Sequence, residues 1–144
     1  PDFYPAAEKA LGDDYREFRS DAYIAWFVLS ATPEMLNDRP NELAAFVRAL
    51  IKAEEFIKSN PDGAMEALET ATEGLLSLEI IKAKFAEAEY EIGLGKGLLD
   101  ILETQANWVV EQGMVEATPS RDLLKGFLAT GPVEAVDSAR ITLQ

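Results

Sequence analysis

Apolar side chains recur at helical spacing along much of this chain. The clearest case is the segment 41–59, in which one stripe is apolar and most charged side chains lie away from it. The stripe is formed by Leu43, Phe46, Val47, Leu50, Ile51 and Ile57. Shorter runs of the same kind precede Gly74, cover residues 77–86 and fill residues 98–112. This pattern predicts four helices in the middle and later parts of the chain.

Start signals for helices precede several of these segments. Thr32-Pro33 predicts the start of a short helix, because threonine caps free N–H groups and proline suits the first helical position. Pro40 restarts a helix in the same way, and Asn60-Pro61 ends the long helix and caps the next. Thr118-Pro119 is expected to cap a short element further on. Near the start of the chain, residues 4–11 read as a short helix that ends at Gly12.

One run of residues has a different character. Residues 23–29 are aromatic, branched or small, and they are apolar on both faces. Such a run is typical of an interior strand of a sheet, although period alone does not distinguish it from a buried helix. Short strands are also predicted at residues 15–18, 89–94 and 140–143. Because a sheet of so few, scattered strands needs cover on both sides, we expect part of the sheet to come from outside this chain.

Composition then limits the partners. The chain has 144 residues, enough for one domain, and 26 acidic against 13 basic side chains give it a net charge of −13. Duplex DNA and anionic membranes repel such a surface, so nucleic acid is not an expected partner. The longest uncharged run, residues 22–33, is shorter than the roughly 20 residues that a membrane-spanning helix needs. Because the chain begins with Pro1 and not with Met, we expect it to be processed or to be a piece of a longer protein.

The sequence contains no histidine and no cysteine. Their absence excludes Ser-His-Asp and Cys-His catalysis, Cys/His zinc sites, Glu-x-x-His di-iron sites and disulfides within this chain. We therefore expect no cofactor, no bound metal and no enzymatic activity. Three glutamates, Glu87, Glu89 and Glu91, share one face of a predicted strand and could contact a cation. An exposed strand face is the simpler explanation of this pattern.

The segment 21–67 contains a series of short sequence motifs in a defined order. It reads Asp-Ala-Tyr-Ile-Ala-Trp-Phe-Val-Leu-Ser-Ala-Thr-Pro-Glu, then Arg39-Pro40-Asn41-Glu42, then an "Ala-x-x-x-Ala" helix, then Asn60-Pro61-Asp62-Gly-Ala64. This order resembles the substrate-binding proteins of ABC importers, in the nitrate, sulfonate, taurine and thiamine-precursor branch. The C-terminal helix and tail of the same family resemble residues 102–113, Pro119 and residues 127–132. Residues 1–12 are similar to the segment where those proteins leave their second lobe, so the resemblance spans nearly the whole chain.

The resemblance implies an α/β fold, the mostly helical C-terminal part of a two-lobed periplasmic-binding-protein-like fold with a few strands of an incomplete sheet. Residues 1–20 would end the second lobe and form the hinge, and residues 21–144 would be the C-terminal part of the first lobe. The implied function is that of a solute-binding component, periplasmic or extracytoplasmic, which captures a small molecule between two lobes and delivers it to the permease of an ABC transporter. The missing N-terminal half, or a dimer mate, is then an expected partner.

Three alternatives remain at this point. The chain could be the ligand-sensing domain of a signalling protein or part of a thiamine-pyrimidine biosynthesis enzyme, since both resemble the same fold. It could also be a free-standing helical interaction domain that binds no ligand. The last alternative predicts that the apolar run at residues 23–29 is covered from within.

Two groups of side chains are candidates for ligand contact. Tyr23 and Trp26 stand at the inferred return between lobes, where aromatic side chains can stack on a ligand, although a role in the core is the simpler explanation. Glu103 and Trp108 lie on the predicted helix 98–112, together with Gln105 and with Asn107, which shares the face of Glu103. A solvated helix face is the simpler account of this second group.

The glycine-rich stretch Gly93-Leu-Gly-Lys-Gly97 has the wrong spacing for both nucleotide-binding fingerprints. A turn between a strand and a helix explains its glycines, so we do not expect it to bind phosphate.

Overall fold

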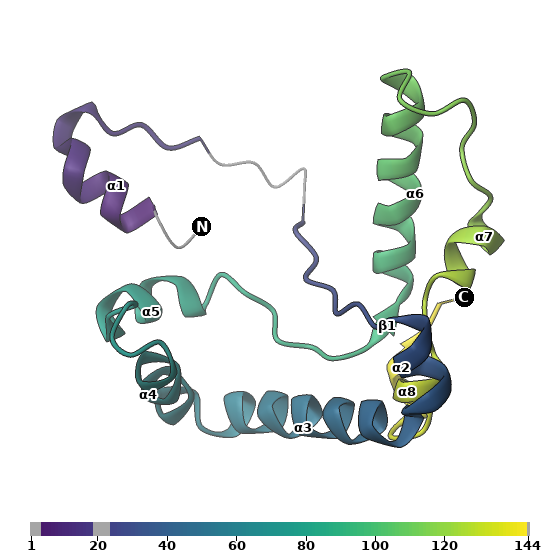
Figure 1. The fold of residues 1–144 in the computed structure, drawn as a ribbon. Coiled ribbons are helices and arrows are strands. Elements are labelled where there is room, and N and C mark those ends of the chain that lie inside the picture. The colour runs from purple at the N-terminus through teal and green to yellow at the C-terminus, as the bar shows by residue number, and fades with distance from the viewer. Residues whose placement is uncertain (1–3, 19–23, 144) are drawn as a thin grey trace. The chain divides into compact units, whose positions relative to one another are not determined.

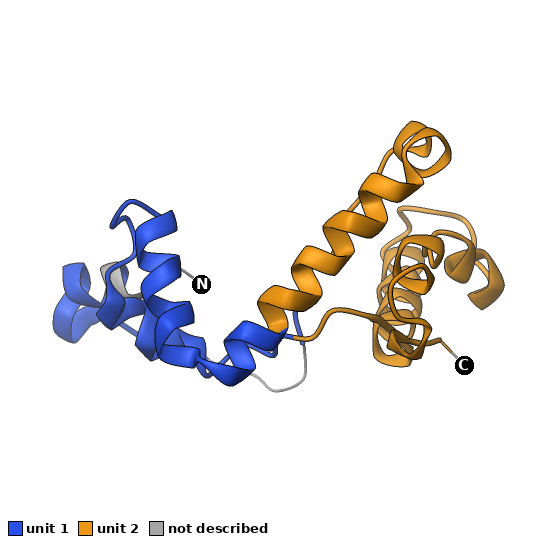
Figure 2. Ribbon diagram, turned by 90° about the horizontal axis from the view of Figure 1, so that it is seen from below, with its two compact units in different colours: residues 1–26, 55–90 blue, residues 27–54, 91–144 orange. Residues whose placement is uncertain are grey.

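The computed structural model describes residues 4–18 and 24–143 (Figure 1). They are mostly helical and include a small two-stranded parallel sheet, consistent with a general α/β class. The chain divides into two compact units, residues 1–26 with 55–90 and residues 27–54 with 91–144 (Figure 2). We describe each unit separately. None of the described helices combines the length and the hydropathy needed to span a bilayer.

The first unit holds α1 (Tyr4–Leu11), α4 (Pro61–Ala71) and α5 (Leu78–Phe85). Helices α4 and α5 pack against each other, and their buried side chains are Ala64, Met65 and Ile81. The carboxylate of Glu69 on α4 accepts a hydrogen bond of 2.9 Å from the Leu78 N–H at the start of α5. Since the first N–H groups of a helix lack partners within it, this bond fixes α5 against α4.

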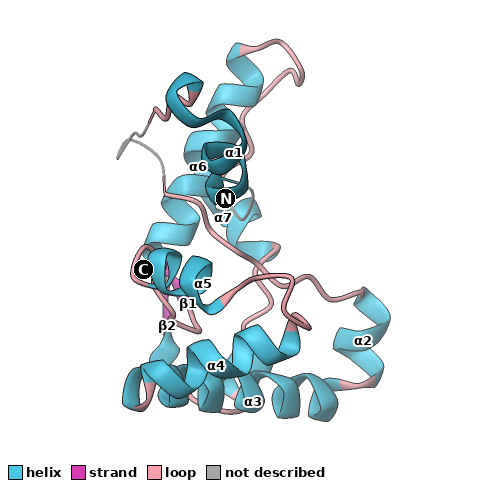
Figure 3. Cartoon of the chain, turned by 90° about the vertical axis from the view of Figure 1, so that its left-hand side faces the viewer, coloured by secondary structure: helices cyan, strands magenta, loops and turns pink. Residues whose placement is uncertain are grey.

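The second unit holds α2 (Pro33–Asp38), α6 (Lys96–Glu111), α7 (Arg121–Gly126) and α8 (Gly131–Glu134). The long helix α3 (Pro40–Ser59) contributes its residues 40–54 to this unit. The strands β1 (Leu94–Gly95) and β2 (Ile141–Thr142) run parallel, with Leu94 opposite Ile141 (Figure 3). The core of the unit consists of Ala44, Ile51, Leu98, Leu99, Leu124 and Val133, of which Leu99 is fully buried.

The helices agree with the sequence pattern, and most of their ends have the expected chemistry. The hydroxyl of Thr32 accepts from the Met35 N–H at 3.2 Å, and the side-chain oxygen of Asn60 accepts from the Gly63 N–H at the same distance. Gly12 and Gly74 adopt positive φ angles just beyond α1 and α4, which glycine does without the steric cost of a Cβ. The predicted cap at Thr118 is wrong by two positions, because α7 begins after Ser120 and the Ser120 hydroxyl accepts from the Leu123 N–H.

Most of the strand predictions are wrong. Residues 15–18 form no strand, and of the segment 89–94 only Leu94 joins the ladder. The terminal strand is confirmed, although it is shorter than predicted. Residues 24–31 form no strand or helix, and nothing in the described part of the chain pairs with their backbone. A strand exists only where a neighbour completes its hydrogen bonds, so the described residues 24–29 of the interior strand predicted at 23–29 form no strand here, and Tyr23 lies outside the described residues.

Candidate functional site

The four residues proposed for ligand contact are distributed over both units. Tyr23 lies outside the described residues, and Trp26 stands in the first unit with 44% of its surface exposed. Glu103 and Trp108 both lie on α6 in the second unit. Trp108 is 53% exposed, so it is not a core residue of this unit. Of the three candidates that the structure describes, Glu103 and Trp108 lie on one element and Trp26 does not.

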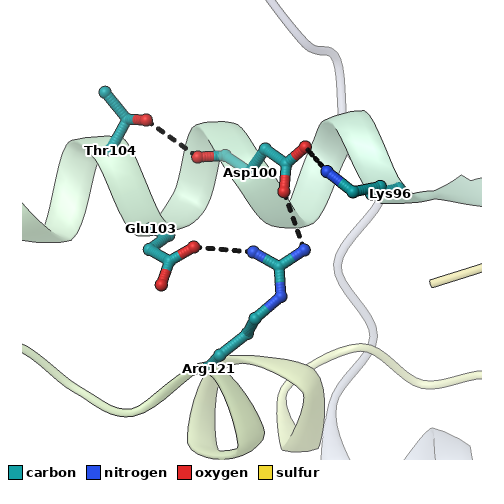
Figure 4. A network of polar contacts seen from close by, with 5 residues as sticks. All are labelled: Lys96, Asp100, Glu103, Thr104 and Arg121. Carbon is teal, nitrogen blue, oxygen red and sulfur yellow. Dashed lines mark hydrogen bonds and ion pairs between the residues drawn. The ribbon is translucent and has the colours of Figure 1, made fainter. Parts of the chain in front are cut away.

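Glu103 belongs to a network of charges between α6 and α7 (Figure 4). The guanidinium of Arg121 donates to Glu103 at 2.6 Å and to Asp100 at 2.7 Å. Asp100 also accepts from the ammonium group of Lys96. Hydrogen bonds from Lys96 and Arg121 lower the pKa of the Asp100 carboxyl, and the bond to Asp100 raises the pKa of Arg121. A ligand amine would have to compete with Arg121 for Glu103.

The same face of α6 carries Asn107. Its side-chain oxygen accepts a hydrogen bond of 3.0 Å from the Thr118 hydroxyl. Glu103 and Asn107 therefore share a face: Asn107 bonds to Thr118 in the segment that leads into α7, and Glu103 bonds to Arg121, the first residue of α7. This face attaches α7 to α6 and is not simply solvated.

The most buried polar contact of the second unit was not predicted from the sequence. Glu54 on α3 is only 4% exposed, and its carboxylate lies 2.7 Å from the guanidinium of Arg140, next to β2. The same carboxylate accepts from the Ile92 N–H at 2.9 Å, and Arg140 donates to the Ile92 carbonyl at 2.9 Å. Three segments that are far apart in sequence thus meet at one ion pair.

A signal for this contact exists in the sequence. Glu54 is three residues after Ile51 and three before Ile57, so it stands on the apolar stripe of its helix. A carboxylate on such a stripe is buried among apolar neighbours and needs a partner of opposite charge. The sequence does not identify that partner as Arg140, which lies 86 positions away.

The glycine-rich stretch adjoins this ion pair. A Cβ placed on Gly93 would lie 2.8 Å from the backbone oxygen of Arg140, which is closer than side chains approach. Gly95 precedes α6 as its N-cap residue. Both glycines therefore serve the packing and the turn, in line with the explanation given by their spacing.

A pocket of about 370 Å³ lies in the second unit between the start of α3 and α8. It is lined by Leu36, Pro40, Asn41, Ala44, Ala129, Gly131, Pro132 and Ala135. Asn41 supplies the only polar side chain of this lining, so the pocket offers little to orient a polar ligand. Within residues 4–18 and 24–143, no group of three or more acidic side chains is arranged to hold a metal ion.

The segment 24–29 departs from ordinary packing because it exposes consecutive large apolar side chains. Phe27 is 91% exposed, Val28 63% and Leu29 70%, and Ile24 is exposed as well. Scattered exposed apolar residues are normal, but a consecutive run of large ones is a mark of an interaction surface. This run also lies within the longest uncharged stretch of the chain.

Comparisons with protein-family models, with curated proteins and with solved structures found no match.

Proposed function

We propose that this chain is part of a solute-binding protein, which holds a small molecule between two lobes and presents it to the permease of an ABC importer. The observation that carries the proposal is the exposed apolar segment 24–29. In a two-lobed α/β fold, this segment is an interior strand whose neighbours are supplied by the other half of the protein. The proposal also places the protein outside the cytoplasm and assigns it no chemistry of its own.

Local features that follow the segment along the chain support this assignment. Immediately after it, Thr32 and Pro33 start a helix, as is common where a strand leads into a helix of an α/β unit. Further along, β1 leads directly into α6, and β2 then returns parallel to β1. Parallel strands need a crossover connection, and such pairs occur almost only in α/β sheets that are covered on both faces. A two-residue parallel ladder is therefore best understood as one edge of a larger sheet.

The free-standing helical domain is the less favoured alternative. It requires the apolar run to be covered from within, whereas Phe27, Val28 and Leu29 are exposed. A second copy of the chain could cover the run in place of the missing half, and the measurements below separate these two cases.

The proposal is tested by calorimetric titration of two proteins, the product of the whole coding sequence and the 144-residue chain. The ligands are nitrate, taurine, an alkanesulfonate and a thiamine pyrimidine precursor. We expect the whole product to bind one of these classes with one site per chain, and the 144-residue chain to bind none. Binding by neither protein, or a coding sequence with no further lobe, would contradict the proposal.

Single substitutions then test whether the ligand binds at Trp26. Trp26→Ala in the whole product should weaken binding, because an aromatic ring at the return between lobes stacks on the ligand, and it should also lower the melting temperature, because Trp26 lies in the proposed interior strand. Phe46→Ala, which removes an exposed aromatic ring from α3, is the matched control and should leave binding unchanged. If both variants bind like the parent, Trp26 has no role in the site.

The remaining alternatives predict different outcomes in the same preparation. A sensor domain should bind ligand but be followed in its coding sequence by a membrane-spanning helix. An enzyme of thiamine-pyrimidine biosynthesis should convert its substrate, so a new product would appear in the titration mixture. Reversible binding without conversion supports the transport function.

A further inference from the structure

No further inference is drawn: the strongest candidate, the apolar pocket of about 370 Å³ between the start of α3 and α8 in the second unit, has Asn41 as the one polar side chain in its lining, and nothing in the structure shows what fills it.

Discussion

The guanidinium of Arg140 lies 2.7 Å from the carboxylate of Glu54, which is almost completely buried, and the two residues are 86 positions apart in sequence. This ion pair joins α3 to the residues that precede β1 and to β2, since Ile92 bonds to both partners. Its energetic role follows from burial. Removing one member of a buried pair leaves the other charge without compensation, whereas exposed pairs contribute little.

Breaking this pair should therefore destabilise the chain. We expect Arg140→Met to lower the free energy of unfolding by about 3 kcal/mol, because it removes the positively charged partner of the buried Glu54 carboxylate. The measurement is urea unfolding followed by circular dichroism. Arg39→Met is the matched control, since the Arg39–Glu42 pair is more than half exposed on both sides and its loss should hardly move the transition. Equal effects of the two variants would show that the Glu54–Arg140 contact is not formed in solution.

A methyl group at position 93 should also be costly. Gly93→Ala places a Cβ against the Arg140 backbone oxygen, so β1 or β2 must shift. We expect a loss of about 1–3 kcal/mol, the usual range for overpacking. Gly126→Ala is the control, because its Cβ would meet nothing within 4 Å. It should be neutral or slightly stabilising, since alanine favours helix over glycine. A Gly93→Ala protein as stable as its parent would contradict the close approach of these segments.

The start of α7 can be located by its cap. Ser120→Ala removes the acceptor for the Leu123 N–H and should cost about 1 kcal/mol. Thr118→Ala removes only an exposed bond to Asn107 and should cost less. The melting temperatures of the two variants show which substitution costs more stability. The reverse order would place the cap at Thr118, as the sequence pattern alone predicted.

Acid stability should depend on Asp100. Its pKa in the folded chain lies below the ordinary value of 3.8, because Lys96 and Arg121 donate to its charged form. A lowered folded pKa stabilises the protein above pH 3.8, and that contribution is lost as the pH falls through the folded pKa. Asp100→Asn should therefore reduce stability at pH 7 and flatten the loss of stability below pH 3.8. The measurement is urea unfolding at a series of pH values.

The control for this titration is Asp122→Asn, which removes the same charge outside the network of Figure 4. Asp122→Asn therefore measures the effect of losing one carboxylate that does not contact Lys96 or Arg121 in this network. If Asp100→Asn gives the same curve as Asp122→Asn, the contacts of Lys96 and Arg121 do not stabilise the folded chain.

Sequence reasoning succeeded where the determinants are local. The apolar stripe of α3 and the caps at Thr32 and Asn60 depend on neighbours within four residues, so the pattern is enough to predict them. The strands depend on distant partners, and among the described residues only Leu94–Gly95 and Ile141–Thr142 pair with each other. Exposed apolar residues at 24–29 look the same in a sequence whether a neighbouring strand is present or not.

The polar contacts also divide into local features, which the sequence predicts, and distant partners, which it does not. The shared face of Glu103 and Asn107 follows from helical spacing, but the bonds to Arg121 and Thr118 depend on how α7 returns to α6. Glu54 could have been identified as a buried charge from its place on the stripe. Its partner Arg140 could not, because nothing local relates the two positions.

Hydrogen exchange of the amides of residues 25–30 tests the central claim most directly. In the 144-residue chain, these amides have no described partner and should exchange about as fast as in an unstructured peptide. In the product of the whole coding sequence, we expect the same amides to be protected at the level of the core helices, because neighbouring strands bond to them. Protection in the 144-residue chain that appears only as its concentration rises would indicate a second copy as the partner. Fast exchange in both proteins would contradict the account, since the segment would then be an interior strand in neither.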